Sequence, residues 1–336
     1  MSPNIVSSTE ELTFGQLYHE IHIQHDPEIA NDVIRKKCLE SSSKDVQKKG
    51  MEFLYANGYF KDLEQLVEKN LLSEDPCVRK WADVFQIFLP QGHHHPTPLE
   101  IYNRIQTIEA KEYELKVLIK FARAHICHLM SHYNKMGDLI SYIDDLLVGL
   151  EDPLFRKYML ERHNHLALIY TFSRNEIIIS RKYAYKILAG SKNPLFLIDV
   201  HMKIGLSYLF ESYSKGMYHF KEALQIAKIR NLDESIHFIE QKLIPFYSAH
   251  FGKTDGISSE NKIEQAHIEI AKGNVEKAIE ILEKYPLNTP EVLYYMGKAK
   301  KDKKLLLQAY EGFIEQQSHY FLCRLPLNET VFIVET

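Results

Sequence analysis

The segment RHNHLALIYTFSRN, residues 162–175, is repeated in outline by VHMKIGLSYLFESY, residues 200–213. Three residues of the first segment, Leu168, Tyr170 and Phe172, have the same residue types 38 positions later. Their counterparts are Leu206, Tyr208 and Phe210. His163 returns at the same distance as His201. A chain that repeats a pattern at this distance contains consecutive structural units of the same kind.

The prolines locate the starts of helices. Six of the twelve prolines follow an Asp, Asn or Thr residue. Such a side chain caps a helix by accepting a backbone N–H, and a proline at the first helical position loses no hydrogen bond. We predict that a helix begins at each of these pairs, which are Asp26-Pro27, Asp75-Pro76, Thr97-Pro98, Asp152-Pro153, Asn193-Pro194 and Thr289-Pro290. Thr97 and Glu100 also match a capping box.

Between these starts the apolar residues recur at helical spacing. In residues 113–138 one apolar stripe runs from Leu115 to Tyr133, and Gly137 is predicted to end the helix. Residues 262–285 predict two short helices joined at Gly273-Asn274. Only the final VFIVET has the composition of a strand. We expect about seventeen helices and essentially no sheet.

Helix pairs with a period of about 34 to 40 residues are typical of tetratricopeptide-like solenoids. The two copies are predicted at 153–190 and 194–230. Small residues stand where paired helices must approach closely: Gly205 with Ala223, Ala266 with Ala278, and Gly297 with Ala309. The predicted fold is all-α, a right-handed superhelix of such pairs. We expect a flexible N-terminus over 1–12, the superhelix over 13–326 and a C-terminal tail over 327–336.

Composition excludes several classes of protein. A 45% hydrophobic content over 336 residues supplies a continuous core, and the 41 Lys and Arg residues are scattered at a net charge of −4. No basic footprint for nucleic acid stands out. There is no signal peptide and no run of roughly 18 apolar residues that could cross a membrane. Four widely spaced cysteines indicate reduced thiols. We expect a cytoplasmic protein.

Polar residues precede each copy of the repeated pattern. Arg162, Asn164 and His201 lie one to two turns before it, on helices predicted to line the concave groove. An asparagine there can donate to and accept from the backbone of an extended peptide. The alternative, that Asn164 bonds within the solenoid or faces water, stays open.

Histidine spacing offers a second candidate site. His125, His128 and His132 share one helical face near Cys127, as metal ligands could. No carboxylate stands at a suitable offset, so we favour a polar stripe and expect no metal and no cofactor. His93 to His95 lie between prolines and are interpreted as a solvated loop. The sequence lacks a nucleophile elbow, a P-loop, a dinucleotide fingerprint and an HExxH motif, which favours a binding protein over an enzyme.

Two long stretches carry a family resemblance. They run from LTFGQLYHEIHIQHDPEIANDVIRKKCLE to LEQLVEK near the N-terminus, and from AKGNVEKAIEILEKYPLNTPEVLYYMGKAKK to HYFLCRLP near the C-terminus. Together with the central GLSYLFESYSKGMYHFKEAL they resemble the arbitrium peptide receptors of Bacillus phages, tetratricopeptide-type quorum-sensing receptors. The resemblance extends from about Thr13 to Pro326.

The resemblance implies a cytosolic receptor in the bacterial host that binds a signalling peptide of about six residues in its groove. The peptide would shift the receptor out of its DNA-competent state and so regulate transcription in the choice between lysis and lysogeny. In the family, groove asparagines and charged residues hold the peptide. The implied peptide-binding residues here are Asn164, His201, Arg162, Tyr208 and Gln241, the last three chosen by their place on inner helices.

The resemblance also implies a homodimer and DNA binding. Family members begin with a helix-turn-helix domain, whereas here the matching region starts about a dozen residues from Met1, so that domain is expected to be absent. The family chain also continues past RLP into an apolar dimerisation helix, while LNETVFIVET lacks helical periodicity. Direct DNA binding and the usual dimer therefore stay open.

Two other classes of function stay open beside the peptide receptor. One is an interaction scaffold whose groove binds a host regulatory protein. The other is a regulator similar to the related phosphatase receptors, for which no catalytic residue is identified. Calorimetric titration with candidate hexapeptides distinguishes the receptor from both.

Asn164→Ala should weaken peptide binding by about 1 to 3 kcal/mol, because a peptide amide would lose its partner. Isothermal titration calorimetry on the wild type and the variant measures this difference. Unchanged affinity would remove Asn164 from the site.

Overall fold

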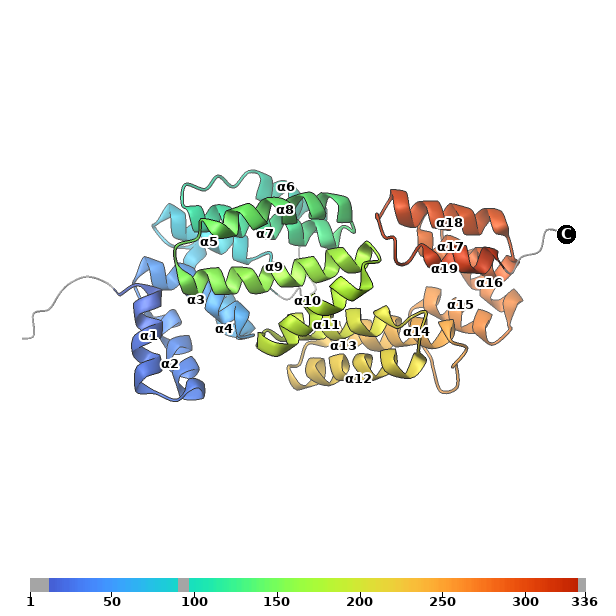
Figure 1. Cartoon of the computed structure of the whole chain (residues 1–336), viewed down its shortest axis with the longest axis horizontal. Coiled ribbons are helices and arrows are strands. Elements are labelled where there is room, and N and C mark those ends of the chain that lie inside the picture. Colours follow the sequence, from blue (N-terminus) through green and yellow to red (C-terminus); the bar gives the residue numbers. More distant parts are fainter. Residues whose placement is uncertain (1–11, 90–96, 332–336) are drawn as a thin grey trace, which may run out of the picture. The chain divides into compact units, whose positions relative to one another are not determined.

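The computed structural model describes residues 12–89 and 97–331, and within them every regular element is helical (Figure 1). The first helices are α1 (Phe14–Gln24), α2 (Pro27–Glu40), α3 (Lys44–Ala56), α4 (Phe60–Leu71), α5 (Pro76–Phe85), α6 (Pro98–Gln106), α7 (Tyr113–Leu129), α8 (Tyr133–Val148), α9 (Pro153–Ser173) and α10 (Ile177–Gly190). They are followed by α11 (Pro194–Ser207), α12 (Tyr213–Ile229), α13 (Asp233–Phe238), the π-helical η1 (Ile239–Leu243), α14 (Ile244–His250), α15 (Lys262–Ala271), α16 (Val275–Leu282), α17 (Pro290–Lys300), α18 (Lys303–Glu315) and α19 (Arg324–Thr330).

The predicted fold class is confirmed. If α13, η1 and α14 are counted as the one continuous helix that they form, the described residues hold 18 helices, against about seventeen predicted. The predicted histidine loop at 93–95, most of the predicted N-terminal segment and most of VFIVET lie outside the described residues.

All six predicted proline starts are confirmed, since α2, α5, α6, α9, α11 and α17 each begin at the expected proline. At α9 the carboxylate of Asp152 accepts the backbone N–H groups of Leu154 and Phe155 at 2.9 and 3.0 Å. At α6 the capping box of Thr97 and Glu100 is complete. Only Asp26 makes no side-chain cap bond. These starts depend on local chemistry, which is why sequence alone could find them.

The two predicted copies correspond to the helix pairs α9–α10 and α11–α12. The predicted close approaches are confirmed for α11 with α12, α15 with α16, and α17 with α18, which pack pairwise. A Cβ on Gly205 would lie 2.4 Å from Phe220, and one on Gly216 would lie 2.1 Å from the Tyr247 hydroxyl. Glycine at both positions lets α12 and α14 pack against their neighbours.

The predicted helix stop at Gly137 is wrong. The chain leaves α7 earlier, where Ser131 adopts a left-handed conformation with φ 57°, and α8 continues through Gly137. A Cβ at this position would lie 2.5 Å from the Tyr170 ring. Glycine is therefore needed for close packing of α8 on α9, a reason that a local sequence signal does not distinguish from a helix stop.

A proline explains the π-helical segment η1. Pro245 has no backbone N–H, so the carbonyl of Gln241 four residues earlier lacks its usual helical donor. The Ser259 hydroxyl donates to that carbonyl, and the Gln241 side chain accepts the backbone N–H of Glu260 at 2.8 Å. Asn261, next along the loop, caps α15. The loop before α15 is thus held against η1.

The chain packs as two compact units, and the domain bounds expected from the sequence, 13–326, stay a prediction. The first comprises the chain up to Ala122 together with Asp145–Leu160, and its core includes Trp81, whose ring centroid lies 5.6 Å from that of Phe155. The second comprises Arg123–Asp144 and the chain from Glu161 onward. The division falls within α7, α8 and α9, because each of these helices contributes to both units.

The last helix of the described residues, α19, extends from Arg324 to Thr330. In the second unit α17, α18 and α19 pack on one another (Figure 1). Glu329 of α19 pairs with Lys298 of α17 and accepts from the Tyr294 hydroxyl at 3.4 Å.

No helix among the described residues is long and apolar enough to cross a membrane.

Gly205→Ala should destabilise the protein by about 1 to 3 kcal/mol, because the added methyl group would overlap the Phe220 ring. Gly190→Ala is the matched control, since a Cβ there meets no atom within 4 Å. Urea unfolding measures the free energy of unfolding of both variants and of the wild type. Equal stability of the two variants would contradict the close packing of α11 on α12.

Candidate ligand-binding cavity

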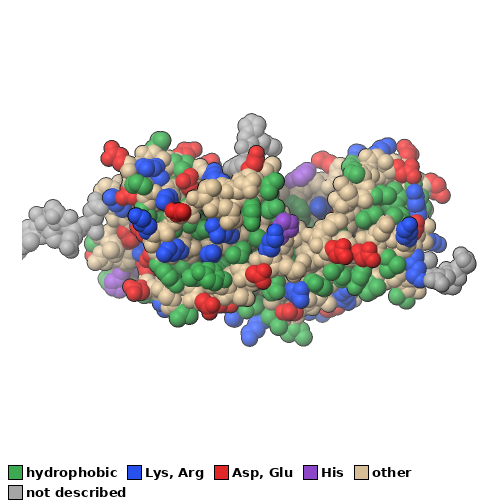
Figure 2. All heavy atoms as spheres, turned by 90° about the horizontal axis from the view of Figure 1, so that it is seen from above, with side chains coloured by type: hydrophobic (Ala, Val, Ile, Leu, Met, Phe, Trp, Pro, Cys, Tyr) green, Lys and Arg blue, Asp and Glu red, His purple; other side chains and the backbone are tan. Residues whose placement is uncertain are grey.

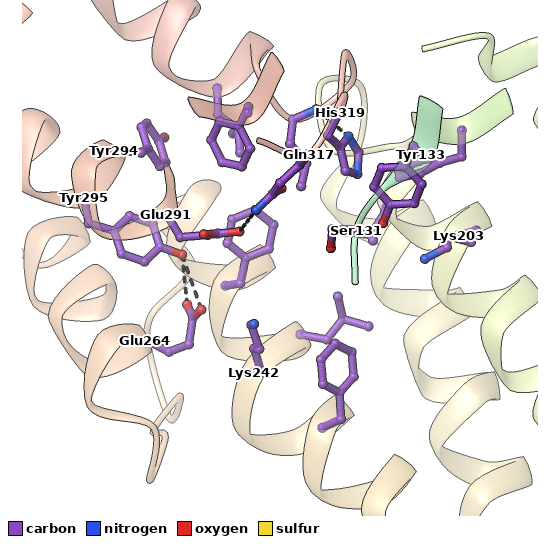
Figure 3. A pocket seen from close by; sticks show the side chains of 18 residues that line it. Ser131, Tyr133, Lys203, Lys242, Glu264, Glu291, Tyr294, Tyr295, Gln317 and His319 are labelled. Carbon is purple, nitrogen blue, oxygen red and sulfur yellow. Dashed lines mark hydrogen bonds between the residues drawn. The ribbon is translucent and has the colours of Figure 1, made fainter. Parts of the chain in front are cut away.

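The second unit contains a cavity of about 280 Å³ (Figure 3). Helices α8, α9, α11, α13, η1, α14, α15, α17, α18 and α19 contribute to it, with the turn before α8 and the segment before α19. Its polar lining residues are Ser131, Tyr133, Lys203, Lys242, Glu264, Glu291, Tyr294, Tyr295, Gln317 and His319. Its apolar lining residues are Phe172, Leu206, Phe238, Leu243, Phe246, Phe313, Leu322 and Leu325. Most of the wall surface is apolar, and a ligand site usually combines such surface with placed polar groups.

Two carboxylates lie at one end of the cavity (Figure 3). The Glu264 side chain is 4% exposed and accepts the Tyr295 hydroxyl at 3.1 and 3.4 Å. Glu291 accepts from the Gln317 amide at 3.4 Å. Within residues 12–89 and 97–331, no Lys or Arg nitrogen lies within 4 Å of either carboxylate. Burial, with the Glu264 charge, raises the pKa of Tyr295 well above its usual range. This end therefore carries negative charge without a paired cation.

Two lysines, Lys203 and Lys242, also line the cavity, and Figure 3 shows Lys203 away from the two glutamates. The Lys203 ammonium lies 3.5 Å from Asp199, whose other oxygen lies 2.9 Å from His165 Nε2. Burial alone would lower the pKa of Lys203, but the Asp199 charge outweighs it and the pKa is raised. Lys242 is exposed and has no carboxylate partner within 4 Å in the described part of the chain.

The segment before α19 closes the cavity and links both sequence repeats. Phe321 packs on Phe172 at 4.5 Å and on Phe210 at 5.3 Å between ring centroids, and these two residues are repeat equivalents. The backbone N–H groups of Tyr320 and Phe321 both donate to the carbonyl of Ser173 at the end of α9. The repeated phenylalanines thus hold the C-terminal wall of the cavity.

His319 in this wall is 6% exposed, and its ring meets those of Tyr133 and Phe172 edge-on at 5.3 and 5.8 Å. Its Nδ1 accepts the backbone N–H of Leu322 at 3.3 Å. Burial, with the nearby Lys203 charge, lowers the pKa of His319 to about 3. It is a neutral packing residue at pH 7.

None of the five predicted peptide-binding residues lines this cavity. His201 and Tyr208 share a neighbour, because His201 Nδ1 lies 3.1 Å from His219 Nδ1 and the Tyr208 ring stacks on His219 at 6.4 Å. The Arg181 guanidinium also lies over the Tyr208 ring, at 4.1 Å. The structure therefore places these two predicted residues together, beside α12.

The other three predicted residues, Arg162, Asn164 and Gln241, lie on α9 and η1. Arg162 is 4% exposed, and Asn164 is half-buried on the same helix. Gln241 bonds to the loop before α15. Their role in binding stays a prediction.

The lysines of the cavity stand one or two residues from predicted ones. Lys203 follows His201 by two positions and Lys242 follows Gln241 by one. Successive residues turn by about 100° around a helix, so such neighbours face different sides. The correct helices can therefore be chosen from the sequence while the face that meets the cavity is missed.

The predicted alternative of a histidine metal site gains no support. Among the described residues, no group of three or more His, Cys, Asp or Glu side chains could hold a metal ion. Burial lowers the pKa of His125 to about 4 and that of His128 to about 3, with neighbouring positive groups adding to the effect.

Figure 2 shows basic and acidic side chains interspersed on the face in view.

Comparisons with known proteins give one family. The family model described as "AimR transcriptional regulator-like" matches residues 30–330. The solved structure described as "phAimR-Ligand" has a TM-score of 0.79 at 16% identity, covering 97% of this chain and 98% of that chain. A second, "SeMet-phAimR", has a TM-score of 0.65 at 14% identity, covering 97% and 87%. No curated protein matches the sequence.

Acid should destabilise the protein through His319. The unfolded chain protonates this histidine near pH 6.5, whereas the folded chain keeps it neutral down to about pH 3. Between these values the unfolded state binds more protons, so the free energy of unfolding decreases as the pH falls. Lowering the pH from 7 to 5.5 should remove about 1 kcal/mol through this residue.

Urea unfolding of the wild type and of His319→Phe at both pH values tests this. The variant should lose less stability than the wild type on acidification. An equal loss in both proteins would contradict the assignment of His319 as a buried neutral group.

Proposed function

Because the chain belongs to the AimR transcriptional regulator-like family, we propose that it is a receptor that regulates transcription in response to a short peptide bound in the cavity of its second unit. The observation that carries this proposal is the charge distribution of the cavity. On a mostly apolar wall stand two carboxylates that no Lys or Arg in residues 12–89 and 97–331 neutralises, and two lysines, Lys203 and Lys242. A short peptide offers both a cationic group and a carboxylate on an otherwise neutral chain.

The buried Glu264 carboxylate favours a cationic ligand group. A carboxylate taken from water without a cation costs free energy, and a ligand ammonium or guanidinium would offset that cost. Glu291 stands beside it as a second acceptor. We assign the N-terminal amine or a basic side chain of the peptide to this end. Lys242 is the proposed partner of the peptide carboxylate, because its ammonium has no carboxylate partner in residues 12–89 and 97–331.

The size of the cavity fits part of a peptide of about six residues. Its volume of about 280 Å³ lies just below the range of small-ligand pockets, about 300 to 1,000 Å³. Each extended residue adds about 3.3 to 3.6 Å of length. The cavity would hold one charged portion of the peptide, and the rest would lie along the neighbouring helices. Asn164, His201 and Tyr208 remain proposed contacts for that remainder.

The regulatory part of the proposal follows the family. The receptor would act inside the bacterial host, where the peptide would shift the phage decision between lysis and lysogeny. Catalysis is not part of the proposal. A mobility-shift experiment with phage promoter DNA, with and without peptide, decides whether the chain binds DNA itself or acts through a partner. A shift that the peptide removes would support direct control.

Glu264→Gln should lower the affinity for a hexapeptide with a basic residue about tenfold, because an ionic hydrogen bond would become neutral. Isothermal titration calorimetry at pH 7.5 measures the change. Glu283→Gln is the control, since Glu283 is exposed and does not line the cavity. If no candidate peptide binds the wild type, the proposed function is wrong.

Amidation of the peptide C-terminus should weaken binding to the wild type about tenfold, through loss of the contact with Lys242. It should have little effect on Lys242→Gln, which already lacks that contact. The two proteins and two peptides form a double-mutant cycle. Additive losses would contradict a direct contact between Lys242 and the peptide carboxylate.

A further inference from the structure

A fully buried histidine stands next to the anionic end of the cavity. His267 is 0% exposed on α15, one turn after Glu264, and its ring stacks on Tyr295 at 4.3 Å between centroids. Within the described residues neither of its ring nitrogens has a hydrogen-bond partner. Nδ1 lies 3.8 Å from Glu264 Oε2, just beyond hydrogen-bonding distance. A buried polar group without a partner is costly and calls for an explanation.

His267 does not line the cavity, whereas Glu264 and Tyr295 do. The imidazole therefore approaches the Glu264 carboxylate from within the protein, and a ligand would approach it from the cavity. The phenol of Tyr295 holds the carboxylate between them at 3.1 Å. One carboxylate thus has two possible cationic partners on different sides.

The titratable groups around His267 come from four helices. They are Glu264 on its own helix α15, His250 on α14, Tyr294, Tyr295 and Lys298 on α17, and Glu329 on α19. Lys298 and Glu329 form an ion pair with each other. Glu264 is left as the carboxylate that no Lys or Arg among the described residues neutralises. Burial lowers the pKa of His267, although the Glu264 carboxylate acts in the opposite direction.

We propose that His267 and the cationic group of the ligand compete for the Glu264 carboxylate, so that proton uptake by His267 and ligand binding exclude each other. This inference rests on the proposed function of the cavity as a site for a peptide with a cationic group. With His267 neutral, Glu264 is available to the ligand. Protonation places a positive charge 3.8 Å from Glu264 and supplies its missing counter-ion from inside the protein.

The inference predicts weaker binding in acid. At pH 7.5 His267 is neutral because its pKa is lowered by burial. As the pH falls, its protonated fraction rises in the free receptor and binding must expel that proton. Affinity for a cationic ligand should therefore decrease from pH 7.5 to pH 5, by a factor that grows with the protonated fraction of His267 in the free receptor.

L-Argininamide is a suitable probe, since it carries a guanidinium and an ammonium group but no carboxylate. Calorimetric titration of the full chain at pH 7.5 and pH 5 compares the wild type, His267→Phe and His237→Asn. Phenylalanine keeps an aromatic ring against Tyr295, and His237 is an exposed histidine outside the cavity. The wild type and His237→Asn should lose affinity in acid. His267→Phe should lose much less, because only protonation of the carboxylates remains.

A nuclear magnetic resonance titration of ¹³C-labelled histidine observes His267 directly, with His267→Phe used to assign its signal. Saturation with argininamide should shift the midpoint of the His267 titration to lower pH. Binding at pH 7.5 with the same acid loss in His267→Phe, or with an unmoved midpoint, would overturn the competition while leaving the cavity a cation site. Failure of argininamide and of all candidate peptides to bind at pH 7.5 would overturn the proposed function as well.

Discussion

The cavity depends on the packing of Phe321 against Phe172 and Phe210. These two phenylalanines occupy the same position in consecutive copies of the sequence repeat, so the repeat forms a matched pair of aromatic contacts for a distant segment. Bonds from the backbone N–H groups of Tyr320 and Phe321 to Ser173 add directionality to this apolar contact. Because these contacts hold the segment against the repeats, residues before and within α19 line the cavity together with residues of α11 and α15.

A second chain of contacts determines where the anionic end lies. Pro245 withdraws a backbone donor, and the freed carbonyl of Gln241 accepts the Ser259 hydroxyl. The same loop supplies Asn261, which caps α15 and sets its first turn, where Glu264 lies. Tyr295 then orients the carboxylate. Gln241, a predicted ligand contact, also bonds to the loop that precedes the helix carrying Glu264.

Much of the fold could be predicted from the sequence, because helix starts depend on neighbouring residues. The Asp152-Pro153 and Asn193-Pro194 pairs located both repeats correctly. Gly137 shows the limit, since its role depends on Tyr170, which is distant in sequence. The cavity cannot be predicted from the sequence for the same reason. Glu264, Glu291 and Gln317 come from separate helices and segments, and no local pattern indicates that they meet.

The charges of the cavity bear most directly on function. Packing between helix pairs accounts for the stability of the fold. It does not account for the buried carboxylate of Glu264, which no Lys or Arg among the described residues neutralises. The proposed cationic ligand would supply the missing counter-ion, and membership of a family of transcriptional regulators is consistent with coupling such binding to a response.

Hydrogen exchange with and without a basic hexapeptide tests the central claim most directly, because it locates binding without any substitution. The account predicts slower exchange in α15, in α17 and in the segment before α19. Unchanged exchange in these three segments, with peptide bound and protection found elsewhere, would contradict it.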